Sequence, residues 1–178
     1  MYLRCRRPAA WWFLVLGLWL LSGCARPQVA GVATMDWTVA SSGAYSSDRG
    51  RFFWGIGRAS GLRSTTLLRA TADNQAQSEM ADLLQVYLAS LAGAVGIDTS
   101  RPENRQMLYE MRQAVMKQAR IVDHRYSDGS GVVMALCRLD LEALKRVLET
   151  NRYADAAVTK RLLREADQVH GKMADRDK

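Results

Sequence analysis

The spacing of hydrophobic residues changes period several times along this 178-residue chain. Residues 51–58, RFFWGIGR, are dense in aromatic side chains and end in glycine-rich sequence, which predicts a short strand. From about Thr65 the apolar residues recur at three- and four-residue steps, which is typical of a long amphipathic helix. The apolar face of this helix is expected to contain Ala76, Met80, Leu83, Leu84, Tyr87, Leu88, Leu91 and Val95.

The second half of the chain predicts another helix, a hairpin and a short third helix. GIDTSRP interrupts the long helix, and Ser100 is the expected N-cap of a helix over residues 102–119. Two β-rich runs, residues 121–126 and 132–139, flank SDGSG, whose Asp-Gly pair favours a hairpin turn. Asp140 is expected to cap the helix that LEALKRVLET forms.

These elements predict an α+β domain over residues 51–150, with a small antiparallel sheet packed on the helices. The expected order is a short N-terminal strand, a long helix, a second helix, a β-hairpin and a C-terminal helix. Residues 24–50 are rich in Ser, Ala and Gly without a sustained period, and are expected to be a flexible tether of up to roughly 80 Å when stretched. Residues 151–178 are expected to be a charged helical tail.

The N-terminus has the pattern of an export signal. Three arginines and no acid precede the apolar run WWFLVLGLWLL, which is too short to span a membrane comfortably. LSGCA follows at residues 21–25, and an apolar residue and two small residues before a cysteine resemble the bacterial lipobox. Residues 1–23 are therefore the predicted signal peptide, and Cys24 is the predicted site of S-diacylglyceryl and N-acyl modification, although an ordinary cleaved signal with a chance cysteine is the alternative.

Charge and cysteine content change once this signal is removed. The full chain carries +7, but residues 1–23 hold three arginines, so the mature chain carries 22 basic against 18 acidic side chains, or +4. This small and scattered excess does not indicate nucleic-acid binding. Cys5 leaves with the signal and Cys24 takes the lipid, so Cys137 is left without a partner for an internal disulfide.

The glycines after the first strand do not indicate a nucleotide site. Gly55, Gly57 and Gly61 form G-x-G-x-x-x-G, one residue longer than the dinucleotide fingerprint, and no second strand with an acidic end follows. Gly55 and Gly57 share one face of the strand, where the lack of side chains would let a helix backbone lie close. Gly61 is expected to make the turn into the long helix.

The stretch from WGIGRASG through LLRATADNQAQSEMADLLQVYLASL, followed by IVDHRYSDGSGVVMALCRLDLEALKRVLE, resembles the small bacterial surface lipoproteins of the Lpp-twenty type. The resemblance covers roughly residues 51–150, and related domains occur in flagellar ring-assembly proteins. Met80 and Ala81, between the acids Glu79 and Asp82, depart from the basic residue expected there. The resemblance implies envelope association and a binding or structural role, with no catalytic residue to carry over.

Candidate catalytic and metal-binding residues are few. His124 has no ligand partner three or four residues away, and Asp123 beside it would point to the opposite face of the strand. We therefore expect His124 to face solvent and Cys137 to be a small buried core residue. The sequence predicts no catalytic site, no cofactor and no metal site.

A second, narrower stripe lies across the long helix from its apolar face. Val86, Ala89 and Gly93 are spaced three and four residues apart and would let another helix approach closely. Two partners fit this stripe: the helix over residues 102–119, folded back, or a second copy of the chain in a homodimer.

The predicted function is that of a non-catalytic envelope lipoprotein with a binding or structural role, held to the membrane through Cys24 and joined to an envelope protein of unknown identity. Residue 25 is Ala and not Asp, which favours the outer membrane with the domain facing the periplasm. The alternative is a small periplasmic hydrolase or ligand carrier with a pocket between the hairpin and the long helix.

Overall fold

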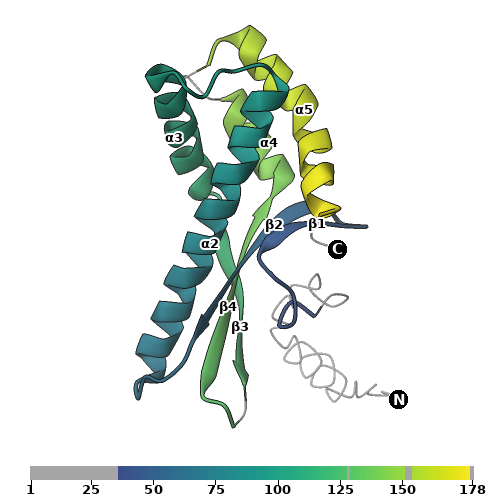
Figure 1. Cartoon of the computed structure of the whole chain (residues 1–178). Coiled ribbons are helices and arrows are strands. Elements are labelled where there is room, and N and C mark those ends of the chain that lie inside the picture. Colours follow the sequence, from purple (N-terminus) through teal and green to yellow (C-terminus); the bar gives the residue numbers. More distant parts are fainter. Residues whose placement is uncertain (1–35, 128, 151–153, 177–178) are drawn as a thin grey trace, which may run out of the picture. The chain divides into compact units, whose positions relative to one another are not determined.

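A four-stranded antiparallel sheet with a long helix across one face organises the folded part of the chain (Figure 1). The computed structural model describes residues 36–127, 129–150 and 154–176. The α+β class and the predicted order of elements are confirmed, strand β1 is added, and the expected helical tail contains helix α5. The elements are β1 (Gly43–Ser47), β2 (Gly50–Ala59), α2 (Thr65–Ala94), α3 (Pro102–Met116), β3 (Arg120–Ser127), β4 (Val132–Asp140), α4 (Leu141–Glu149) and α5 (Ala156–Ala174).

The strands lie in the order β1-β2-β4-β3, and every neighbouring pair is antiparallel. The N-terminal strand β2 therefore pairs with the second strand of the hairpin, and these two strands form the centre of the sheet. Gly55 lies opposite Cys137, and Gly57 opposite Ala135, so the glycines and the small residues of β4 share the face that α2 covers.

The two strand glycines let α2 lie directly on β2. A Cβ added to Gly55 would lie 2.8 Å from the backbone nitrogen of Met80, and one added to Gly57 would lie 2.5 Å from that of Ala76. These separations are too short for any real side chain, so the prediction that the glycines serve close helix packing is confirmed. Gly61 has a φ of +78°, as its predicted turn requires, and the Ser64 side chain then caps α2 by accepting from the Leu67 backbone.

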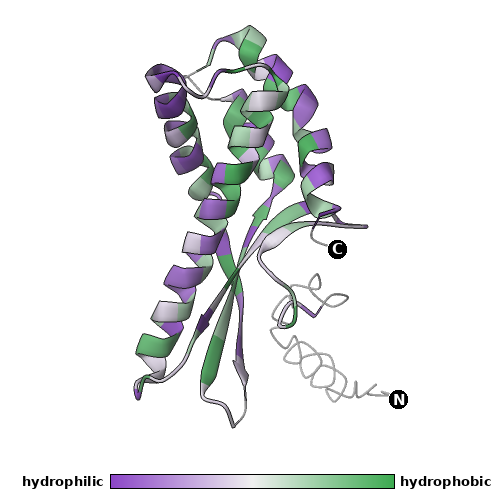
Figure 2. Cartoon of the chain, in the orientation of Figure 1, coloured by the Kyte–Doolittle hydropathy of each residue, from purple (hydrophilic) through white to green (hydrophobic). Residues whose placement is uncertain are grey.

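The C-terminal half of α2 packs against α3 and α5, while α4 contacts β2 and β4 (Figure 1). Tyr87 lies at the centre of this region: its ring meets Phe53 edge-on with the centroids 5.0 Å apart, and its hydroxyl donates to the Ala166 carbonyl oxygen at 3.0 Å. In Figure 2, hydrophilic and hydrophobic positions alternate along α3 and α5, as expected for helices that bury one side.

The segment before β2 is folded and not a tether over all of residues 24–50. Residues 43–47 form β1 along β2, because the extended backbone there completes the hydrogen bonding of the β2 edge. The Trp37 side chain, 1% exposed, donates from its indole nitrogen to Asp123 at 3.0 Å. The tether prediction is therefore wrong for residues 43–47, and residues 24–35 lie outside the described part.

The charged tail expected from residue 151 onwards contains a packed helix. Asp155 caps α5 by accepting from the Val158 backbone at 2.7 Å. Lys145 also reaches Asp167 on α5 at 3.1 Å, which links α4 to the new helix. The α5 residues that are buried are Leu162, Ala166, Val169, His170, Met173 and Ala174.

The hairpin agrees with its prediction to within one residue at each strand end, but two predicted caps differ. Arg101 and not Ser100 is the N-cap of α3, and its side chain makes no capping hydrogen bond. Asp140 is the N-cap of α4 as predicted, yet its carboxylate does not bond the helix backbone. It accepts from Arg138 at 2.7 Å, because a charged partner on the same strand lies within reach.

Candidate ligand-binding site

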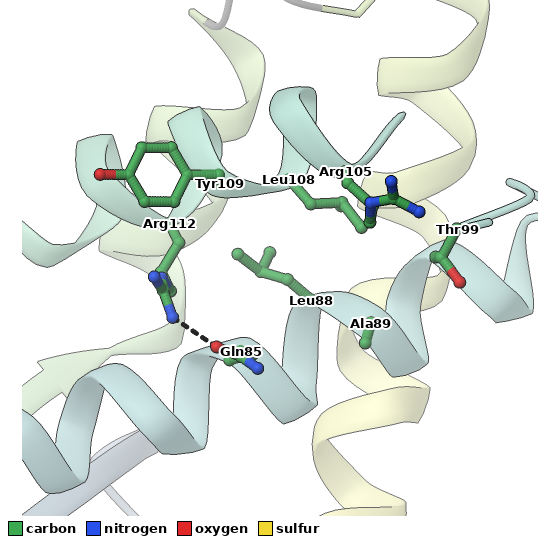
Figure 3. A pocket seen from close by; sticks show the side chains of 8 residues that line it. All are labelled: Gln85, Leu88, Ala89, Thr99, Arg105, Leu108, Tyr109 and Arg112. Carbon is green, nitrogen blue, oxygen red and sulfur yellow. Dashed lines mark hydrogen bonds between the residues drawn. The ribbon is translucent and has the colours of Figure 1, made fainter. Parts of the chain in front are cut away.

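A pocket of about 350 Å³ lies between the C-terminal half of α2 and the facing side of α3 (Figure 3). This volume is at the lower end of the range for small-molecule sites. The pocket exists because GIDTSRP turns the chain back, with Gly96 at a φ of +75° and Pro102 opening α3. Its lining residues are Gln85, Leu88, Ala89, Thr99, Arg105, Leu108, Tyr109 and Arg112.

The floor of the pocket is apolar. Leu88 is 2% exposed and belongs to the main core, and Leu108 packs against that core from α3. Ala89 is exposed and, as an alanine, leaves open the space that a larger side chain would fill. The prediction that the helix over residues 102–119 covers the second stripe is therefore wrong, because Ala89 and Gly93 remain exposed and Val86 is 54% exposed.

Two arginines on α3 give the pocket its charge. Arg105 donates to the Ser100 carbonyl oxygen at 2.6 Å, and Arg112 donates to the Gln85 side-chain oxygen at 2.5 Å. The Arg112 guanidinium also lies 5.5 Å from the centre of the Tyr109 ring. Neither arginine pairs with a carboxylate among the residues that the structure describes, so the lining is cationic.

His124 does not face solvent as predicted. Its side chain is 14% exposed and contacts α2, with Nε2 2.5 Å from an Asp73 carboxylate oxygen and Nδ1 3.2 Å from an Arg69 guanidinium nitrogen. This geometry fits a ring that donates from Nε2 to Asp73 and accepts at Nδ1 from Arg69. The prediction failed because the register of β3 shifts between Ile121 and Asp123, which places His124 opposite Ala135 on the face that α2 covers.

Cys137 is a buried core residue, as predicted. It is fully buried on the α2 side of β4, and burial, with a smaller contribution from Asp73, raises the pKa of its thiol to about 11. The thiol therefore stays protonated and is a poor nucleophile at neutral pH. No three His, Cys, Asp or Glu residues gather into a metal-binding group within residues 36–127, 129–150 and 154–176.

The second histidine, His170, has a structural position inside the fold. Its Nε2 lies 3.1 Å from the Phe52 carbonyl oxygen and donates to it, while Nδ1 is buried without a hydrogen-bond partner. Burial is the main cause that lowers the pKa of this imidazole. His170 is therefore neutral at pH 7 and ties α5 to β2.

The pocket brings together residues that sequence reasoning did not single out, and Cys24 lies outside the described part. The signal in the sequence was the seven-residue spacing of Arg105 and Arg112, which places them two turns apart on one face of α3 with Leu108 between them. Only the fold shows that Gln85 and Ala89 of α2 lie opposite this face. No helix in the described part is both long and apolar enough to cross a membrane.

No protein-family model matches this chain, and no curated protein matches it.

Proposed function

We propose that this chain is a non-catalytic envelope lipoprotein, anchored by a lipidated Cys24, whose folded domain serves a binding or structural role. The observation that carries the proposal is the sequence LSGCA at residues 21–25, behind a basic start and an eleven-residue apolar run. The acyl chains on such a cysteine anchor firmly, because each buried methylene contributes about 0.8 kcal/mol and two or three chains act together.

The position of the domain supports a role near the membrane. The described domain begins at Asp36, and residues 25–35 connect it to Cys24 along the chain. Even fully extended, these residues span at most about 40 Å. A partner of the domain would therefore be found close to the lipid surface.

The positions of the reactive side chains support a role in binding. Cys137 is buried, His124 is held by Asp73 and Arg69, and His170 donates to a strand carbonyl. Each of these groups thus has a structural explanation. The resemblance to lipoproteins of the Lpp-twenty type favours the same role and an envelope partner near the flagellum or the cell wall.

Replacement of Cys24 tests the anchor. The full-length chain is expressed in a bacterial host that is fed an alkyne-tagged fatty acid, and the purified protein is analysed by click labelling and intact mass. Cys24→Ser should lose all label and keep residues 1–23, whereas Cys5→Ser, a matched change inside the signal, should be labelled and cleaved like the unchanged chain. Label that persists in Cys24→Ser contradicts the proposal.

The membrane of residence follows from residue 25. Because Ala25 lacks the acidic side chain that retains such lipoproteins in the inner membrane, the protein should sediment with outer-membrane markers in a sucrose gradient. Ala25→Asp is expected to move it to the inner-membrane fractions. Recovery of the unchanged protein with inner-membrane markers would show that the assignment to the outer membrane is wrong.

A ligand carrier is the second candidate function, and the pocket between α2 and α3 favours it. The alternative derived from the sequence placed a pocket between the hairpin and the long helix, where Ala76, Ala135 and Cys137 are fully buried. The α2–α3 pocket is lined by no Ser, Cys, His, Asp or Glu, so its chemistry suits binding better than hydrolysis. Equilibrium dialysis of the chain against small anions tests this function directly.

A further inference from the structure

The α2–α3 pocket has a cation at each end and an apolar middle (Figure 3). Arg105 extends toward Thr99 at one end, and Arg112 extends toward Gln85 at the other. They are seven residues apart on α3, which separates their backbone positions by roughly 10 Å along the helix axis. One small anion would not contact both groups, but an elongated molecule would.

Both guanidinium groups have donors left for a ligand. Each uses one NH1 nitrogen for a neutral oxygen, at Ser100 and at Gln85. A guanidinium carries five N–H donors in a planar fork, and that fork matches the two oxygens of a carboxylate. The remaining donors of Arg105 and Arg112 are therefore available to an anionic group.

The charge at the pocket is not compensated by the protein in the described part of the chain. Four arginines in the described part have an aspartate within 4.0 Å, namely Arg51, Arg101, Arg125 and Arg138, whereas Arg58 and Arg161 bond only to neutral oxygens. Arg105 and Arg112 also have no aspartate partner there, although both border a concave surface. A bound anion would supply the missing negative charge.

The middle of the pocket would hold an apolar chain. Leu88 and Leu108 face each other between the two arginines, and Ala89 leaves the space beside them open. Apolar area buried against these residues contributes roughly 25 cal/mol per Å². As in other small-molecule sites, the charged ends would orient the ligand, and the apolar middle would contribute to its affinity.

We propose that this pocket binds an elongated organic dianion, with a carboxylate at each end and an apolar chain between them. One carboxylate lies in the fork of Arg105 near Thr99, and the other lies in the fork of Arg112 near Gln85. The chain between them covers Leu88, Ala89 and Leu108. The site goes beyond the lipid-anchored role and does not depend on Cys24.

A chain-length series tests the proposal. The full-length chain in a non-ionic detergent is titrated by calorimetry with linear dicarboxylates from butanedioate to dodecanedioate, and with monocarboxylates of the same lengths. Binding should be strongest for octanedioate and decanedioate, whose carboxylates are about as far apart as the backbone positions of Arg105 and Arg112 along α3, roughly 10 Å. Each matching monocarboxylate should bind about tenfold more weakly, since one charge-assisted pair is lost.

Variants separate the pocket from general attraction to a basic protein. Arg105→Gln and Arg112→Gln should each weaken the binding of octanedioate about tenfold. Each variant should then bind a dicarboxylate and the monocarboxylate of the same length with similar affinity. Arg164→Gln removes the same charge from the exposed side of α5 and should leave the affinity unchanged. Ala89→Phe fills the apolar middle and should abolish binding, with an unchanged circular dichroism spectrum showing that the variant is folded.

Several outcomes would overturn the proposal. Affinity that is independent of chain length, or an equal effect of Arg164→Gln, would reduce the binding to non-specific charge attraction. If no member of the series binds, the proposal that the pocket binds a dianion is refuted. Binding of an acidic peptide without binding of any dicarboxylate would assign the groove to a protein partner. None of these results depends on whether Cys24 is lipidated, so the two proposals fail separately.

Discussion

Replacing Gly57 by alanine should destabilise the fold strongly, although this change is among the smallest possible. A Cβ at this position would lie 2.5 Å from the Ala76 backbone nitrogen and would also contact the Ala72 carbonyl oxygen. Both atoms belong to the backbone of α2, so no side-chain rotation relieves the overlap. The helix itself would have to move away from the sheet.

The magnitude follows from that displacement. Ordinary contact begins near 3.4 Å, so α2 would have to withdraw by at least about 0.9 Å to clear the Ala76 nitrogen, and by more to clear the Ala72 carbonyl oxygen. Overpacking of this kind costs about 1–3 kcal/mol or more, and the shift also loosens the fully buried Ala72 and Ala76. We therefore expect Gly57→Ala to lower the free energy of unfolding by about 3 kcal/mol, a large fraction of the 5–15 kcal/mol typical of a domain.

Urea denaturation followed by circular dichroism at 222 nm measures this loss, with Gly93→Ala as the matched control. Gly93 lies in α2 with no atom within 4 Å of an added Cβ, so alanine there should stabilise the protein by about 0.5–1 kcal/mol. Gly55→Ala should destabilise the protein about as much as Gly57→Ala. The double variant should lose less stability than the two single losses added together, because one movement of α2 relieves both overlaps. A Gly57→Ala variant within 0.5 kcal/mol of the unchanged chain would refute the close packing of α2 on β2.

Two further changes test the α2 surface and the buried histidine. Ala89→Glu should change the free energy of unfolding by no more than about 0.5 kcal/mol, because Ala89 is exposed, and a large loss of stability would contradict that position. If the chain forms a homodimer across Val86, Ala89 and Gly93, light scattering should show that the variant has half the mass of the unchanged protein. His170 has a folded-state pKa below its unfolded value, mainly through burial, so its contribution to stability is complete above about pH 6.5 and is lost as the pH falls through the folded-state value. His170→Gln keeps a donor for the Phe52 carbonyl oxygen and does not titrate, so urea midpoints from pH 7 to pH 5 should fall less than in the unchanged chain; equal falls would show that another group is responsible.

The parts of the fold that could be predicted from sequence are those where one local signal decides the structure. Apolar residues at helical spacing from Thr65 onwards gave α2, and the Asp-Gly turn gave the hairpin to within one residue. The glycine pair could be interpreted because a strand alternates its faces, so Gly55 and Gly57 had to lie on the same one.

The parts that were missed depend on contacts between distant segments. β1 has the sequence GAYSS, which carries little strand signal, and it exists because β2 offers an unpaired edge. α5 carries many charges, yet Leu162, Ala166, Val169 and Met173 recur at helical spacing and are buried. The helix was expected from that spacing, but the charged residues around it favoured an exposed tail, so the packing of α5 on the domain was not predicted.

The pocket also shows what a hydrophobic pattern cannot predict. Leu108 contributes an ordinary helical apolar position, and the same pattern would be written for a closed helix–helix interface. The interface stays open because Ala89 is too small to fill it and because Arg105 and Arg112 occupy the two ends. A larger apolar residue at position 89 would bury more surface and is expected to stabilise the packing of α3 on α2, so the present sequence gives up stability at this place. A small residue that leaves space beside two arginines without carboxylate partners in the described part is the combination expected of a binding site, so Ala89→Phe should raise stability and abolish dicarboxylate binding together.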